Sequence, residues 1–232
     1  MPAQFSRRAI LGQIALGGAL AAGAPVRHAF AQMDDRPWFF LTDDEARWLA
    51  AIVDVFIPED DYPSASQAGV VDYIDFQMAT HYGEGARLYL EGPFYTGTPE
   101  QGYQAPYPPA ELLRRGIAAA MAEDDVTAQD AAGRERYVQA MSESDGMMGD
   151  TDVPVVTFFT ELLSLANEGY FSDPIYMGNN AYAGWKMVGF PGAHAYYLSH
   201  VDKHDRPFDK PPMGIAHGEY PRTPPRSVGQ ES

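Results

Sequence analysis

The chain contains no cysteine among its 232 residues. This absence excludes disulfide bonds, iron–sulfur ligation, covalent c-type haem attachment and thiolate catalysis within these residues. Several standard motifs are missing as well from residue 32 onward. There is no GxGxxG for a dinucleotide, no GxxxxGK[ST] for a phosphate, no HExxH for zinc and no GxSxG nucleophile elbow. We therefore expect no cofactor in this chain.

Basic residues are scarce. The sequence has 16 Lys and Arg residues against 32 Asp and Glu residues, which gives a formal net charge of −16. So strong a negative charge repels the phosphates of nucleic acids and an anionic lipid surface, so we expect no nucleic-acid partner.

A long apolar run of transmembrane length is also missing. The uncharged stretch 10–24 is too short and too rich in Gly and Ala for a span of about 20 apolar residues. It follows Arg7 and Arg8 in SRRAIL, which is the twin-arginine pattern of signals that export folded proteins. The A-x-A site that ends at Ala31 predicts cleavage there, so that residues 1–31 form a signal peptide. An ordinary export signal and a retained anchor are the alternatives.

The remaining periodicity is helical, and no run alternates apolar and polar residues as a half-buried strand does. We predict an all-α fold, a compact bundle of about five to seven helices with long aromatic loops, over 32–204. Thr42 and Glu45 form a capping box for the first helix. The most apolar helix is expected to begin at an Asp152 cap, to end at Gly169 and to lie in the centre of the core. Residues 205–232, rich in proline, are expected to form an extended tail, with disorder and an arm that lies on a partner surface as the two alternatives.

Histidines and carboxylates give only weak candidates for chemistry. His200 and His204 would share one face of a helix at i and i+4 and could bind a metal together with Asp202 or Asp205. Solvent exposure of this charged stretch is the simpler interpretation. His81 falls on an apolar helix face, which predicts a hydrogen-bonded core histidine rather than a catalytic base.

The segment 168–193, EGYFSDPIYMGNNAYAGWKMVGFPGA, combines six aromatic residues with five glycines. A long irregular segment of this composition is typical of a binding loop, and aromatic side chains are common anchors in protein interfaces. A cover for the neighbouring core helix is the alternative. The predicted interface residues are Tyr170, Phe171, Pro174, Tyr176, Asn179, Trp185 and Phe190.

At these residues the chain resembles the gluconate 2-dehydrogenase subunit 3 family, the small (gamma) subunit of membrane-bound FAD-dependent gluconate 2-dehydrogenase. EGYFSDPIYMGNN and GWKMVGFPGA carry the resemblance, and LTDDEARWLAAIVDVFIPEDD, YLEGPFYTGTPEQGYQ and PPAELLRRGI support it. The similarity extends over about residues 40–200. The family often has Gly where Met177 stands.

The resemblance implies a non-catalytic subunit of a three-part complex. In such complexes a large flavoprotein holds FAD and oxidises the substrate, and a multihaem cytochrome c subunit passes electrons to quinone in the membrane. The small subunit escorts the folded flavoprotein through the twin-arginine translocase and stabilises it in the periplasm, at the inner membrane. Related complexes oxidise fructose, sorbitol, 2-ketogluconate or glucose. A stand-alone metal enzyme and a periplasmic ligand-binding module remain the other hypotheses.

Overall fold

The computed structural model describes residues 37–95, 97–98, 101–194, 197–206, 208 and 210–215. The predicted signal residues Arg7, Arg8 and Ala31 lie outside this range, as does the predicted tail beyond residue 215. Within it the fold is all-α, as predicted, and contains isolated β-bridges but no strand. No described helix is both long and apolar enough to cross a membrane. The described α-helices are α3 (Asp43–Phe56), α4 (Val70–Met78), α5 (Pro109–Glu123), α6 (Ala131–Glu143), α7 (Val155–Phe171) and α8 (Ala183–Val188).

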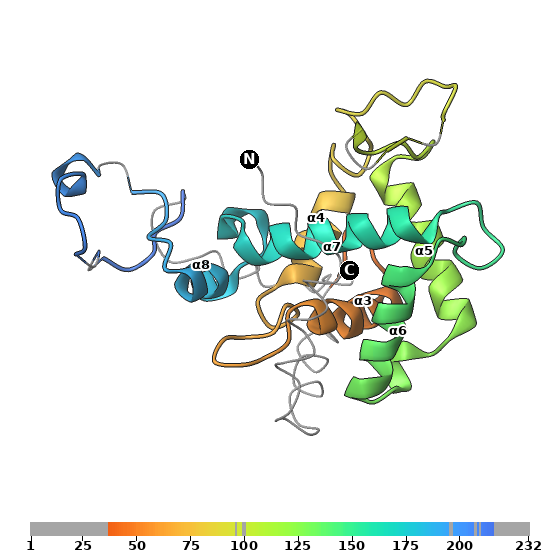
Figure 1. The fold of residues 1–232 in the computed structure, drawn as a ribbon, viewed down its shortest axis with the longest axis horizontal. Helices are drawn as coiled ribbons and strands as arrows, with labels where there is room; N and C mark the ends of the chain where they lie inside the picture. Colours follow the sequence, from red (N-terminus) through yellow and green to blue (C-terminus); the bar gives the residue numbers. More distant parts are fainter. Residues whose placement is uncertain are drawn as a thin grey trace, which may run out of the picture.

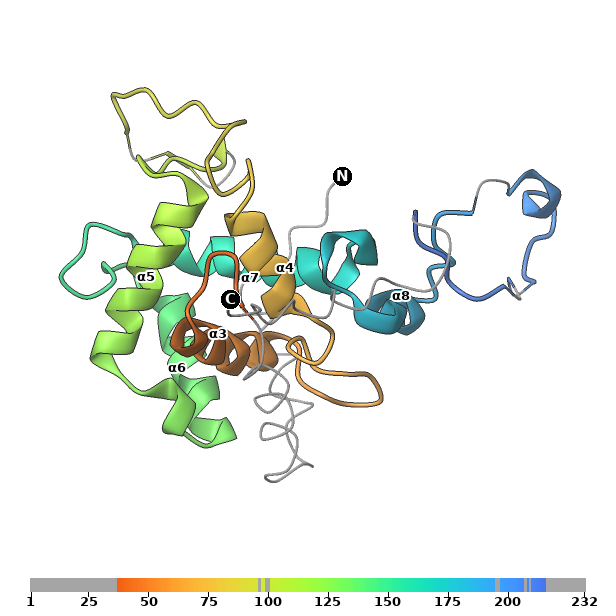
Figure 2. The same ribbon diagram turned by 180° about the vertical axis from the view of Figure 1, so that it is seen from behind.

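Helix α7 is the centre of the bundle, as its wide apolar surface predicted. It contacts α3, α4, α5, α6 and α8, and the core gathers around it (Figures 1 and 2). Gly116 of α5 permits one of these close approaches, because a Cβ there would lie 2.2 Å from the Phe158 ring. Phe158 in turn contacts the buried Trp48 of α3 at a centroid distance of 6.2 Å. Removal of these apolar side chains from water is the main stabilising contribution to the fold.

Helix ends follow the sequence signals in some places and not in others. The capping box of α3 is confirmed: Thr42 Oγ1 accepts from Glu45 N at 3.3 Å, and a Glu45 carboxylate oxygen accepts from Thr42 N at 2.8 Å. The Asp152 cap is wrong, because α7 has Pro154 at its N-cap position without any side-chain cap. The predicted end at Gly169 is also wrong. Gly169 lies inside α7, and its missing side chain lets Tyr73 of α4 pack against the helix.

An internal carboxylate attaches the segment before α3 to α4. Asp75 is buried and accepts the backbone N–H groups of Phe39, Phe40 and Leu41 at 2.9, 2.8 and 2.9 Å. These bonds place the exposed Phe39 ring edge-on against Phe76 of α4, at a centroid distance of 6.3 Å. The charge of Asp75 is thus compensated by three backbone donors, as buried polar groups require.

The described residues between Gly192 and Met213 leave the domain and return to it. The two ends of this loop meet where Ala193 N donates to Met213 O at 2.6 Å. Ile215 N then donates to Asp173 at 2.7 Å. The loop projects beyond α8 (blue in Figure 1), and the predicted boundary at residue 204 falls inside it.

Candidate functional site

The segment after α7 is folded around one buried asparagine. Asn179 is fully buried; its Nδ2 donates to Ser172 O at 2.8 Å and its Oδ1 accepts from Gly184 N at 2.8 Å. Trp185 of α8 donates its Nε1–H to Phe171 O, at the end of α7, at 2.7 Å. The sequence predicted an irregular loop here. Most of this segment instead forms two 3₁₀ turns, η3 (Pro174–Tyr176) and η4 (Asn180–Tyr182), and the short α8.

Close backbone contacts explain two of the glycines in this segment. A Cβ at Gly178 would lie 2.1 Å from Gly169 O, and a Cβ at Gly184 would lie 2.1 Å from Tyr170 O. Met177 has a φ of +81°, in the left-handed region that glycine adopts without steric cost. The structure therefore gives a physical reason for glycine at this position, where this chain has methionine.

The predicted interface residues divide into two groups. Four of them are buried in this chain's own fold: Tyr170, Pro174, Asn179 and Trp185. The other three remain accessible: Phe171 is half-buried, Tyr176 is 46% exposed and Phe190 is 47% exposed. The first group stabilises the segment and offers no area to a partner, so only the second group is available for binding.

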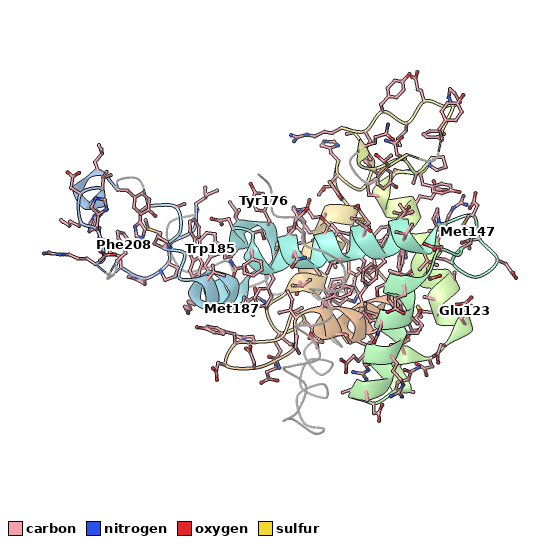
Figure 3. All side chains as sticks on the ribbon, viewed as in Figure 1. Glu123, Met147, Tyr176, Trp185, Met187 and Phe208 are labelled. Atoms are coloured by element: carbon pink, nitrogen blue, oxygen red, sulfur yellow. The ribbon has the colours of Figure 1, made fainter. Side chains whose placement is uncertain are left out.

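Tyr176 borders a groove between α4 and the end of α7, which we call the α4–α7 groove (Tyr176 is labelled in Figure 3). Its volume is about 440 Å³. Ser172 is one of its lining residues, and the Ser172 hydroxyl oxygen is buried without a hydrogen-bond partner in the described structure. The residues that line the groove are Tyr73, Gln77, Glu168, Phe171, Ser172 and Tyr176.

Two tyrosine–glutamate pairs mark the surface of α7 along this side. Tyr73 donates its hydroxyl hydrogen to Glu168 at 2.9 Å, and Tyr82 donates to Glu161, which is seven positions earlier on the same side of the helix. Burial raises the pKa of Tyr73, and the neighbouring Glu168 charge raises it further. Burial also raises the pKa of Glu161; the hydrogen bond from Tyr82 lowers it, and the Glu168 charge raises it.

Sequence reasoning missed these pairs. The partners are 95 and 79 positions apart in the chain, and the packing of α4 and of the turn after it against α7 brings them together. The one available signal was the i, i+7 spacing of Glu161 and Glu168, which places both on one side of a helix.

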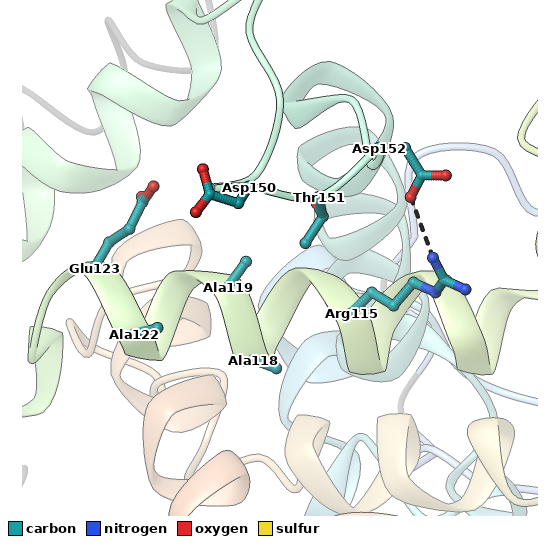
Figure 4. Close-up of a pocket in the computed structure, with 9 residues that line it drawn as sticks. Arg115, Ala118, Ala119, Ala122, Glu123, Asp150, Thr151 and Asp152 are labelled. Atoms are coloured by element: carbon teal, nitrogen blue, oxygen red, sulfur yellow. Dashed lines mark hydrogen bonds and ion pairs between the residues drawn. The ribbon is translucent and has the colours of Figure 1, made fainter.

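A second groove lies between α5 and residues 149–152 (Figure 4). Its floor is made of Ala118, Ala119 and Ala122, and its volume is about 980 Å³. At one end Arg115 pairs with Asp152 at 3.1 Å, and the pKa of Asp152 is lowered by a hydrogen bond from Tyr107 and by Arg115. Glu123, Asp150 and Thr151 also line this groove, and the Thr151 hydroxyl donates to Met148 O at 2.6 Å.

The histidine candidates do not assemble a metal site in the described residues. The i, i+4 relation of His200 and His204 required an α-helix, but only a 3₁₀ turn, η5 (Leu198–His200), forms there. Nowhere in the described ranges do three His, Asp or Glu side chains meet as metal ligands would. His200 instead contacts Phe208 at a ring distance of 5.0 Å. The core position predicted for His81 is wrong: its side chain is 91% exposed and pairs with Glu84 at 2.9 Å.

Comparison with known proteins gives a family match for this chain. No curated protein and no solved structure gives a significant match. A family model, Gluconate 2-dehydrogenase subunit 3, matches residues 43–192, which is from the start of α3 to the neck of the projecting loop. The match covers well over half of the chain. The chain therefore belongs to the gluconate 2-dehydrogenase subunit 3 family, whose members are small subunits of a dehydrogenase complex.

Proposed function

We propose that this chain is a non-catalytic small subunit that exports and stabilises the FAD-containing large subunit of a sugar or sugar-acid dehydrogenase. The SRRAIL sequence at residues 6–11, in a chain of this family, carries the proposal. A twin-arginine signal exports folded proteins, so a flavoprotein that has bound FAD in the cytoplasm can travel with the subunit that bears the signal. The complex then works in the periplasm, at the inner membrane, with a multihaem cytochrome c subunit as electron acceptor.

Two features of the described structure support a binding role rather than catalysis. The helical core is closed and filled by apolar side chains, while aromatic residues stay exposed on the surface around α4 and α7. Exposed aromatic rings of this kind are typical of protein interfaces, where they are buried by the partner. The proposed substrate of the complex is gluconate, with fructose, sorbitol, 2-ketogluconate and glucose as alternatives within related complexes.

The experiment replaces Arg7 and Arg8 by lysine in a strain that also expresses the large subunit. We expect the large subunit and its dehydrogenase activity to disappear from the periplasmic fraction and the FAD-loaded protein to accumulate in the cytoplasm. Arg27→Lys, in the same leader but outside the motif, is the control and should export normally. Unchanged periplasmic activity in the double lysine variant would refute the escort role.

A further inference from the structure

Two glutamates of α7 have no basic partner within the described structure: Glu168, which lines the α4–α7 groove, and Glu161, seven positions before it. Glu168 accepts hydrogen bonds from Tyr73 and from Ser164, and Glu161 accepts one from Tyr82. All the ion pairs recorded between described residues involve other carboxylates. Two glutamates on one side of α7 therefore carry negative charge that only neutral donors offset.

The groove beside them has the chemistry of a site for a cationic side chain. Tyr73, Phe171 and Tyr176 supply aromatic surface, and Glu168 supplies a carboxylate. A guanidinium can stack on an aromatic ring and still donate several hydrogen bonds in its plane.

Other occupants fit this chemistry less well. An apolar side chain would remove water from Glu168 and leave its charge without compensation, which is costly. An acidic side chain or a sugar acid would meet the like charge of Glu168, in a chain that already carries a net charge of −16. Arginine, in contrast, is enriched together with tyrosine among the residues that dominate binding energy in protein interfaces.

We propose that an arginine of the FAD-containing large subunit inserts into the α4–α7 groove, stacks on Tyr176 and pairs with Glu168. This assignment rests on the proposed function and adds to it the surface at which the two subunits meet. It also gives Tyr176 a specific role among the predicted interface residues that the fold leaves accessible.

The test measures the affinity of the purified large subunit for Glu168→Gln and Tyr176→Ala variants of the complete small subunit. We expect each substitution to weaken binding by about tenfold to a hundredfold, as for central interface residues. The dependence of affinity on salt should be smaller for Glu168→Gln than for wild type, because the charged pair is lost. Two controls make the same chemical changes elsewhere: Glu143→Gln on the exposed side of α6, and Tyr89→Ala at a tyrosine that is 81% exposed.

Both groove variants are expected to fold. Glutamine still offers Tyr73 an acceptor oxygen, and Tyr176 lies at the surface, so thermal melts should stay close to wild type. Control-like affinity of the groove variants for a large subunit that binds wild type would overturn the arginine site and leave the escort role intact. Failure of wild type itself to bind would refute both. Saturable binding of glucose or gluconate that Tyr176→Ala abolishes would assign the groove to a sugar and also overturn the inference.

Discussion

Replacement of Asp75 by asparagine tests whether one buried carboxylate holds the segment before α3 in place. Asp75 accepts three backbone N–H groups, from Phe39, Phe40 and Leu41, at 2.8–2.9 Å. Asparagine has a single acceptor oxygen. Its amide NH₂ group, in place of the second carboxylate oxygen, would face a backbone N–H group, and two donors cannot form a hydrogen bond. At least one backbone N–H therefore loses its partner, and the remaining bonds lose their charge assistance.

The expected loss of stability follows from the number of bonds. A hydrogen bond to a charged acceptor contributes about 1.5–3 kcal/mol, and an unsatisfied buried donor costs about 1–3 kcal/mol. Leu41 is buried, whereas Phe39 is 68% exposed, so water can replace part of what is lost at Phe39. We expect Asp75→Asn to lower the free energy of unfolding by about 2–3 kcal/mol and Asp75→Ala by about 3–5 kcal/mol.

Urea denaturation followed by tryptophan fluorescence measures this loss, since Trp48 is buried in the core. With a denaturant dependence of about 2 kcal/mol per molar, the midpoint of Asp75→Asn should fall by about 1 M. Asp150→Asn, at an exposed position, makes the same chemical change and should leave the midpoint in place. Equal midpoints for the two variants would show that the three backbone bonds contribute no net stability and would refute this reasoning.

Two further predictions concern α7 and the segment after it. Burial raises the pKa of Glu161, so the folded state binds the carboxyl proton of Glu161 more tightly than the unfolded state does. The stability that this proton contributes is present below the ordinary glutamate pKa and is lost as pH rises through the pKa of Glu161 in the folded state. Glu161→Gln should therefore gain stability relative to wild type as pH rises from about 4 to about 7, and a pH-independent difference in chemical denaturation would contradict this. Gly178→Ala should lower the free energy of unfolding by about 2 kcal/mol, because the added Cβ would meet the Gly169 carbonyl oxygen. Gly146→Ala is the control, because a Cβ there has only the Ser144 side chain nearby, at 3.3 Å. Its melting temperature should stay close to that of wild type.

Local signals in the sequence predicted a large part of the fold. The capping box at Thr42 and Glu45 and the central place of α7 both appear in the structure. Each depends on residues close together in the chain, where side-chain and backbone chemistry act over one or two helical turns. The helix end predicted at Gly169 was wrong because this glycine serves tertiary packing. Its missing side chain leaves room for the Tyr73 ring beside α7, and the helix continues past it.

The candidate site was harder to predict, because aromatic residues serve both folds and interfaces. Trp185 and Tyr170 looked like partner anchors, yet both are buried, and their polar atoms bond to Phe171 O and Pro63 O within the chain. The tyrosine–glutamate pairs on α7 depend on contacts between distant segments, which composition and periodicity do not encode. Only the exposed remainder of the predicted set, Tyr176 above all, lies where a partner could touch it.

Glu161→Gln and Tyr176→Ala together distinguish effects on the stability of this chain from effects on its binding to the large subunit. A partly buried carboxylate without a basic partner in the described chain destabilises the isolated subunit as it ionises, so its neutral replacement should stabilise that subunit near neutral pH. If a guanidinium of the large subunit approaches Glu161, the same charge becomes favourable in the complex. Glu161→Gln should then melt higher alone and yet bind the large subunit more weakly, while Tyr176→Ala should change binding without raising the melting temperature. This opposite response is expected when a surface is adapted to its complex rather than to the free chain.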